Sequence, residues 1–172
     1  MRVLYKLHDA IRRRVKSLKG LSMKKLCAAL FFLLFIASNY SDAGALCVSV
    51  SKANLRAGPS TKYEKVWEVY KYMPFKKVGV SLSGDWYAVQ DVDGDVSWIS
   101  KKLVTEKYHC AVVKAEEVNI RTGPGTNYKK TSLGPAKQYY SFKILERKGP
   151  WVKVKDEWGE SGWIHTDYIW IE

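Results

Sequence analysis

The sequence predicts an all-β protein built of two small β-barrels in tandem, and three observations lead to this prediction. A ten-residue stretch that begins at Asn54 recurs at Asn119, 65 positions later. Short runs alternate between apolar and polar residues with the period of a strand, and none has the period of a helix. Gly and Pro separate these runs, as they do at turns. Each copy is about sixty residues long, so five or so short strands per copy indicate a small barrel.

The duplication extends well beyond this stretch. The two copies read Asn-Leu-Arg-Ala-Gly-Pro-Ser-Thr-Lys-Tyr and Asn-Ile-Arg-Thr-Gly-Pro-Gly-Thr-Asn-Tyr. The same offset relates Gly84-Asp85-Trp86 to Gly149-Pro150-Trp151, and Trp98-Ile99 to Trp163-Ile164. An offset that stays constant over this distance indicates duplication of one structural unit.

The expected elements follow in the same order in each copy. Residues 48–51 and 113–115 alternate between apolar and polar side chains and predict short, half-buried strands. In the Asn-aliphatic-Arg motif the aliphatic residue is expected to point inward. The following Gly-Pro pair predicts a sharp turn, because Gly permits positive φ and Pro restricts the next φ. Residues 75–80 and 140–145 predict a further strand in each copy.

A predicted hairpin closes each copy. Gly84 or Gly149 turns the chain into a strand, and Asp93-Gly94 and Trp158-Gly159 stand where the hairpin turn belongs. Asp-Gly is a strong turn signal. Trp98-Ile99 or Trp163-Ile164 then begins what we expect to be the last strand.

The ordered motifs resemble the bacterial Src-homology-3 (SH3b) family. They are Asn-Leu-Arg-x-Gly-Pro-Ser, Gly-Asp-Trp-Tyr-x-Val and Gly-x-x-x-Trp-Ile, and the set occurs twice between residues 48 and 171. Repeat two has Gly162 before its Trp, as the family usually has, and repeat one departs with Ser97. The resemblance implies two SH3-like barrels, at 46–108 and 109–172. It also implies binding of peptidoglycan stem peptides or of an envelope protein segment in an aromatic-lined groove.

Residues 1–45 are predicted to be a secretory signal segment, which starts at Met1 or at Met23. A basic region precedes an apolar run at 26–37, and a small-x-small site at 43–45 follows it. The run has twelve residues, against about 20 needed to span a bilayer, so a permanent anchor is disfavoured. We expect cleavage after Ala45, export to the periplasm or the cell exterior, and membrane contact only before cleavage.

The predicted cleavage changes how the charge is interpreted. The full chain carries +12, but nine Lys or Arg and two Asp precede Leu46. The remainder has 20 basic and 15 acidic side chains, a net charge of +5. A mildly basic exported protein gives little support to nucleic-acid binding.

Cys47 and Cys110 are predicted to form a disulfide. Cys47 opens the first strand of repeat one, and Cys110 follows its last predicted strand, at 103–104. First and last strands lie close in small barrels of this type, and the compartment permits disulfides. The bond would contribute roughly 4 kcal/mol on the chain-entropy model. The alternative is a pair of free, buried thiols.

No catalytic residue, metal site or cofactor is predicted. His109 and Cys110 are neighbours, so on a strand they face opposite sides and cannot act as a nucleophile pair. His165 corresponds to Ser100 in repeat one and is not essential if both copies do the same work. The acidic run 91–95 lacks the long loop and terminal Glu of an EF-hand, so a hairpin turn is favoured over a calcium site.

Seven residues are candidates for ligand binding. They are Tyr63, Trp86, Tyr128, Trp151, Trp158, Arg56 and Arg121. Each Tyr ends the polar loop after Gly-Pro, and the two strand tryptophans are expected to form the opposite wall of a groove. The alternative is structural, since Trp and Tyr hold small barrels together and Arg satisfies turn carbonyls.

Some aromatic residues have no aromatic counterpart in the other copy at this offset. Among them are Trp158, at a hairpin tip, and Trp67, Tyr70 and Tyr72. An aromatic side chain at a tip is hard to bury in its own barrel, so we expect it to pack between barrels or to receive a ligand. The sequence therefore predicts an exported binding protein rather than an enzyme. The competing class is a structural or partner-binding periplasmic protein without wall affinity.

Overall fold

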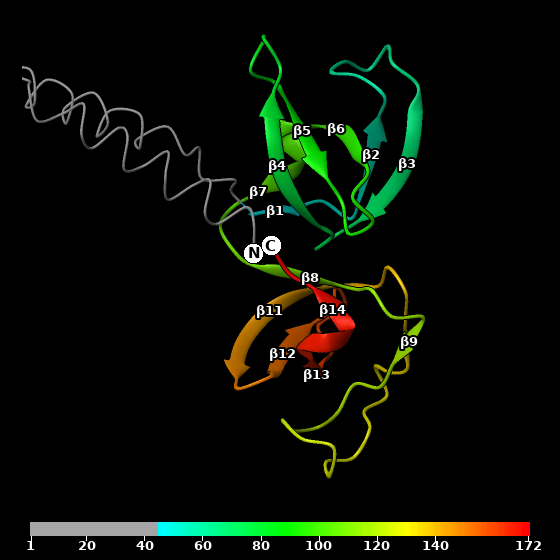
Figure 1. Cartoon of the computed structure of the whole chain (residues 1–172), viewed down its shortest axis with the longest axis vertical. Helices are drawn as coiled ribbons and strands as arrows, with labels where there is room; N and C mark the ends of the chain where they lie inside the picture. The colour runs from blue at the N-terminus through cyan, green and yellow to red at the C-terminus, as the bar shows by residue number, and fades with distance from the viewer. Residues whose placement is uncertain (1–44) are drawn as a thin grey trace, which may run out of the picture. The chain divides into compact units, whose positions relative to one another are not determined.

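The first barrel is one antiparallel sheet of seven strands in a computed structural model that describes residues 45–172 (Figure 1). Its elements are β1 (Ala45–Val48), β2 (Lys52–Arg56), β3 (Lys65–Tyr70), β4 (Pro74–Val80), β5 (Trp86–Gln90), β6 (Val96–Ser100), the 3-10 turn η2 (Lys101–Leu103) and β7 (Val104–Thr105). The strand order is β3-β2-β6-β5-β4-β1-β7, so the first and last strands are neighbours, as expected. The predicted signal segment up to residue 44 lies outside the described residues.

The second barrel repeats this arrangement. Its elements are β8 (Cys110–Val113), β9 (Glu117–Val118), β10 (Ala136–Lys137), β11 (Ser141–Lys148), β12 (Trp151–Lys155), β13 (Ser161–His165), the 3-10 turn η3 (Thr166–Tyr168) and β14 (Ile169–Trp170). Five strands form a sheet in the order β13-β12-β11-β8-β14, and β9 pairs with β10. Arg121 forms isolated bridges with Lys130 and Trp163, just as Arg56 pairs with Lys65 and Trp98. The prediction of an all-β fold with two small barrels is confirmed.

The predicted hairpins are present. The strands expected to begin at Trp98 and Trp163 are not the last ones, and the strand predicted at 103–104 corresponds to β7. Gly94 and Gly159 have φ of 92° and 104°, which suits Gly at a tight turn. β6 and β13, which contain Trp98 and Trp163, are each followed by a 3-10 turn and one more short strand. These last strands, β7 and β14, pair with β1 and β8 and complete each barrel.

The half-buried strands predicted at 48–51 and 113–115 are wrong in position and in burial. β1 ends at Val48 and β8 ends at Val113. All four residues of β8 are buried, because its two faces serve two cores. Ala111 and Val113 pack in the core of the second barrel, whereas Val112 packs in the core of the first. An alternation between apolar and polar residues is expected only where one face meets water.

The cores explain the aliphatic position of the repeated motif. Leu55 and Ile120 are 1% and 0% exposed, so both point inward as predicted. A Cβ added at Gly162 would lie 2.5 Å from Cγ2 of Ile120. Leu has no branch at Cβ, which explains why the first barrel accommodates the buried Ser97 at the position of Gly162.

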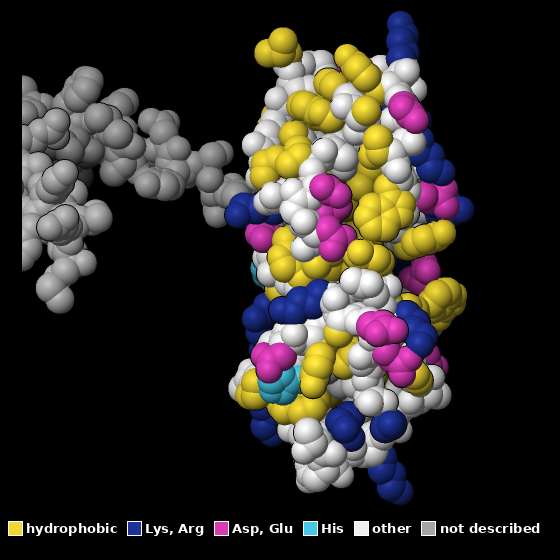
Figure 2. Space-filling model, turned by 45° about the vertical axis from the view of Figure 1, so that its right-hand side comes forward, with side chains coloured by type: hydrophobic (Ala, Val, Ile, Leu, Met, Phe, Trp, Pro, Cys, Tyr) yellow, Lys and Arg dark blue, Asp and Glu magenta, His cyan; other side chains and the backbone are white. Residues whose placement is uncertain are grey.

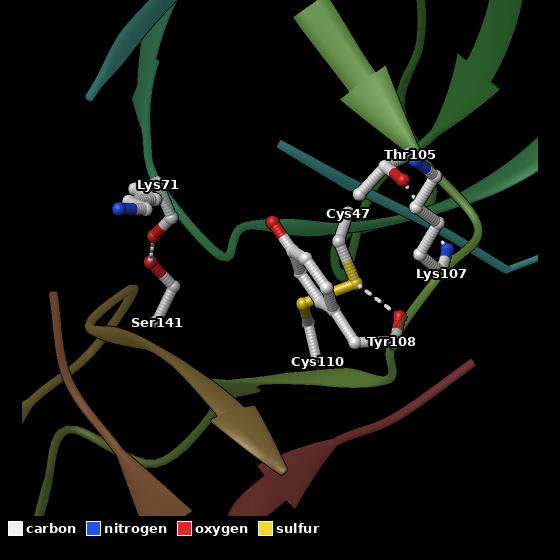
Figure 3. Close-up of a disulfide and its surroundings, with 7 residues drawn as sticks. All are labelled: Cys47, Lys71, Thr105, Lys107, Tyr108, Cys110 and Ser141. Atoms are coloured by element: carbon white, nitrogen blue, oxygen red, sulfur yellow. Dashed lines mark hydrogen bonds between the residues drawn. A yellow bond between two sulfur atoms is a disulfide. The ribbon is translucent and has the colours of Figure 1, made fainter. Parts of the chain in front are cut away.

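The predicted disulfide between Cys47 and Cys110 is present, but its position in the fold differs from the expectation (Figure 3). Cys110 belongs to β8, so the bond joins the first strands of the two barrels instead of closing the first barrel. Both cysteines are buried, and the rings of Tyr72 and Tyr108 pack edge to face beside them, with centroids 5.7 Å apart. The two thiols are therefore oxidised in a dry, aromatic contact between barrels.

The structure makes Tyr72 and Tyr139 equivalent, although the constant offset of the sequence aligns Tyr72 with Lys137, and both reach across to the other barrel. Each backbone N–H donates to a first-strand carbonyl, that of Val48 or Val113, at 2.9 Å. Their φ values are 69° and 66°, a region that costs a non-Gly residue about 1–3 kcal/mol. Tyr72 packs with Cys110, and Tyr139 packs against the core of the first barrel. The strained backbone thus directs both side chains into the contact between barrels.

Candidate functional site

The repeated Arg and Tyr form the same clamp in each barrel. The Nη1 group of Arg56 donates to the Tyr63 carbonyl at 2.7 Å. Its counterpart on Arg121 donates to the Tyr128 carbonyl at 2.8 Å. Each guanidinium therefore closes the polar loop that follows the Gly-Pro turn.

Each tyrosine ring lies on the glycine of its own loop. A Cβ added at Gly58 would come within 2.5 Å of the Tyr63 ring, and one at Gly123 within 2.3 Å of the Tyr128 ring. Only Gly leaves room for the ring at this position. Tyr63 and Tyr128 remain 50% and 44% exposed, so one face of each ring stays open to solvent.

A cavity of about 320 Å³ lies in the second barrel. Its walls are Glu117, Val118, Asn119, Arg121, Thr126, Trp151, His165, Asp167 and Tyr168, and we call it the second-barrel cavity. It brings together two of the predicted site residues, Arg121 and Trp151. Tyr128 is not among its walls.

Three aromatic rings follow one another along this cavity. The Trp151 and His165 rings meet edge to face with centroids 5.2 Å apart, and the Tyr168 centroid is 6.2 Å from that of His165. The backbone N–H of Asp167 donates to Nδ1 of His165 at 3.3 Å. With guanidinium, carboxylate, amide and hydroxyl groups around these rings, the cavity can hold an extended polar chain by stacking and hydrogen bonds.

The second-barrel cavity depends on residues that the first copy lacks. Its walls Glu117, His165, Asp167 and Tyr168 correspond to Lys52, Ser100, Lys102 and Leu103 in the first copy. His165 was not predicted as a site residue, because Ser100 stands in its place in repeat one. Glu117, Asp167 and Tyr168 were not predicted as site residues either. The signal that could have found them was the difference between the copies, not their identity.

A second hollow, of about 430 Å³, lies between the barrels. Its walls are Trp67, Glu68, Tyr70, Lys71, Met73, Gln138, Tyr139, Tyr140, Ser141, Glu157 and Trp158, and we call it the junction groove. Trp67, Tyr70 and Trp158, which have no aromatic counterpart at the constant offset, therefore meet here, and Trp158 is 73% exposed. On the face drawn in Figure 2, hydrophobic side chains gather with acidic side chains among them. The predicted residues Arg56, Tyr63 and Trp86 line neither of these two hollows.

The turn that carries Trp158 is held by a buried carboxylate. Oδ1 of Asp156 accepts the backbone N–H groups of Trp158, Gly159 and Glu160 at 2.8–3.0 Å. Asp156 is only 2% exposed. Its hydrogen bonds therefore set the position of Trp158 at the rim of the junction groove.

The first barrel uses Asp91 in the same way. Its Oδ1 accepts the N–H groups of Asp93 and Asp95 at 3.0 and 2.9 Å, so the acidic run forms the favoured hairpin turn. Burial is the largest influence on the Asp91 carboxyl group and raises its pKa. Within residues 45–172, no three His, Cys, Asp or Glu side chains are grouped so that they could hold a metal ion.

We expect Asp156→Ala to lower the free energy of unfolding by about 1–3 kcal/mol, because three N–H groups lose their acceptor. Asp91→Ala removes two such hydrogen bonds and should lower the free energy of unfolding by less than Asp156→Ala does. Urea denaturation of both variants measures the difference. Equal losses would show that the number of backbone bonds does not determine the stability of these turns.

Models of one family match both barrels. The description "Bacterial SH3 domain" applies to the match at residues 49–106 and again to the match at 116–169. The two matches correspond to the two repeats. Within residues 45–172, no helix has the length and apolar character needed to cross a bilayer.

The chain is also similar to parts of longer proteins. It is 34% identical over 93 residues to the "Probable cell wall amidase LytH" of Staphylococcus aureus, covering 49% of this chain and 31% of that protein. A Bacillus subtilis (strain 168) protein with the provisional name N-acetylmuramoyl-L-alanine amidase YrvJ is 37% identical over 54 residues, which are 31% of this chain and 10% of that protein. The chain thus spans less than a third of the length of these relatives.

Similarity to solved structures is lower. The structure named "Endolysin LysPBC5 CBD" has a TM-score of 0.31 and 18% identity, with 78% of this chain and 97% of that chain covered. An NlpC/P60 endopeptidase from Photobacterium damselae subsp. piscicida has a TM-score of 0.34 and 12% identity, with 72% and 31% covered. The family assignment therefore depends on the two sequence matches.

Proposed function

Because the chain belongs to the bacterial SH3 family and carries two such domains in tandem, we propose that it is an exported, non-enzymatic binding protein of the cell envelope. The proposed ligand is a peptidoglycan peptide, held in the second-barrel cavity. The observation that supports this assignment is the row of aromatic rings from Trp151 to Tyr168, with Arg121 beside it. Aromatic faces together with a few polar groups are typical of peptide grooves.

The charges of the cavity suit a peptide that carries both signs. Arg121 can pair with a carboxylate, because a guanidinium has five N–H donors and the clamp to Tyr128 is made by Nη1 alone. Asp167, whose side chain is 78% exposed, can pair with an ammonium group, whereas Glu117 is already paired with Lys137. Peptidoglycan peptides offer carboxylates, amides and amines, and the name of LytH places that relative at the cell wall.

We assign this binding to the second barrel rather than to both. In the first barrel, Lys52 and Lys102 replace the two acids, and Leu103 replaces the exposed Tyr168. Ser100 stands in place of His165, so the first copy lacks the acidic groups and two of the three rings. In this proposal the first barrel stabilises the second through the disulfide between Cys47, in β1, and Cys110.

Co-sedimentation of the exported protein with purified peptidoglycan sacculi tests the proposal. We expect Tyr168→Ala to weaken binding about tenfold, as loss of an anchoring tyrosine commonly does. Leu145→Ala is the matched control, since Leu145 lies in the same barrel with similar exposure, 47% against 46%, and outside both hollows. Binding of the control should equal that of the wild type.

The competing proposal is a protein that binds another envelope protein. It predicts no sedimentation with sacculi even at low salt. That result would overturn the peptidoglycan assignment. Sedimentation that Tyr168→Ala leaves unchanged would overturn the choice of cavity.

A further inference from the structure

The junction groove is built from residues that only the pairing of two barrels brings together. β3 of the first barrel supplies Trp67 and Tyr70, and the hairpin tip of the second supplies Trp158. The Trp67 and Tyr139 rings pack edge to face with centroids 5.3 Å apart. Exposed aromatic faces from both barrels thus surround one hollow, an arrangement that favours an apolar or cationic guest.

Acidic groups of the two hairpin turns act on two tyrosines of the groove wall, Tyr139 and Tyr140. A hydrogen bond with Asp93 raises the pKa of Tyr139, and burial and the neighbouring acids raise it further. Burial and the charge of Asp156 raise the pKa of Tyr140 to about 12. The carboxylates whose charges act on these two tyrosines are Asp91, Asp93, Asp95, Asp156 and Glu157.

The basic groups at the groove are already engaged. Lys71 is the one basic residue among the groove walls formed by residues 45–172. Its Nζ lies 5.3 Å from the centroid of the Tyr72 ring. Glu68, on β3, is paired with Lys52 and Lys65 at 2.8 and 2.9 Å. Glu157 is half-buried at the rim beside Trp158. The groove therefore combines aromatic faces with one carboxylate, that of Glu157, which a positive guest can neutralise.

We propose that the junction groove binds the side chain of a lysine, or of a similar diamino acid, carried by an extended peptide. The aliphatic stem lies against Trp67, Met73 and Tyr140, and the ammonium group lies near Glu157 and the Trp158 ring. Ammonium groups are attracted to aromatic faces and to carboxylates alike, and the stem gains from apolar contact. This site is distinct from the second-barrel cavity and shares no residue with it.

The test uses two peptides, acetyl-Ala-Lys-Ala-amide and its twin with Nε-acetyllysine, added to the exported protein with its disulfide intact. The indole N–H signals of its seven Trp residues are followed by NMR. We expect the signals of Trp67 and Trp158, assigned with Trp→Phe variants, to move saturably with the lysine peptide and not with its acetylated twin. Equal responses to both peptides would show that charge is not recognised and would overturn the proposal.

Paired variants locate the site. Glu157→Gln should weaken binding of the lysine peptide about threefold, while Glu160→Gln, on the same turn but outside the groove, should leave it unchanged. Trp158→Ala should weaken it about tenfold. If Glu157→Gln and Glu160→Gln weakened binding of the lysine peptide equally, the peptide would be attracted only by the overall negative charge of the turn. That result would contradict the assignment.

The response to the lysine peptide is tested independently of binding to sacculi. Tyr168→Ala removes a wall of the second-barrel cavity and should not change the response to the lysine peptide. A response of Trp151 in place of Trp67 and Trp158 would place the ammonium group in the second-barrel cavity and would overturn this proposal while sparing the proposed function.

Discussion

Removal of the disulfide by Cys47→Ala together with Cys110→Ala should lower the free energy of unfolding by about 4 kcal/mol. The bond closes a loop of 63 residues, and on the chain-entropy model such a loop stabilises by roughly this amount. Small domains are stable by only about 5–15 kcal/mol, so the loss is a large share of the total. Urea denaturation of the oxidised protein and of the double variant measures the difference.

Reduction provides the control. Dithiothreitol should lower the stability of the wild type to that of the double variant and leave the variant itself unchanged. Because both cysteines are buried, the native protein should resist reduction until it opens. Two alkylatable thiols in the native exported protein, or a double variant as stable as the wild type, would contradict this account.

Val112→Asp should destabilise the first barrel although the residue belongs to a strand of the second. Val112 is fully buried among residues of the first core, such as Val48 and Phe75. A carboxylate without a partner at such a position costs about 3–5 kcal/mol. Hydrogen exchange of backbone amides in β2 and β6 measures the loss of protection in the first barrel.

The matched control is Val78→Asp, in β4, where the side chain is 47% exposed. It adds the same charge at the surface and should change the free energy of unfolding by less than about 1 kcal/mol. If Val112→Asp loosens β12 and β13 and leaves β2 and β6 protected, the two cores are independent and the shared role of β8 is wrong.

The local structure of each barrel could be predicted from the amino-acid sequence. The constant offset established two copies, and the positions of Leu55 and Ile120 identified the inward face of the motif. Gly94 and Gly159 marked the hairpins. These features depend on backbone freedom and on alternation within a few residues, so they can be read without knowledge of distant neighbours. The disulfide pair was also predicted, because two of the three cysteines follow the predicted cleavage site.

The contact between the two barrels could not be predicted from the sequence and is visible only in the tertiary structure. The half-buried strand was predicted at 113–115, whereas β8 lies at Cys110–Val113 and is buried on both faces because Val112 enters the other core. The alternation that predicts a solvent face cannot indicate a second protein surface. For the same reason the sequence placed Cys110 beside the end of the first barrel, whereas it lies on the first strand of the second.

The candidate sites divide in the same way. Arg121, Trp151 and Trp158 were predicted from their motifs and their turn, and each lies in the wall of a hollow. Tyr139 and Tyr168 were not predicted, since their role depends on residues far away in the chain. Identity between the copies indicated what each barrel needs in order to fold. The hollows depend on residues in which the copies differ and on contacts between barrels, and those exist only after the chain has folded.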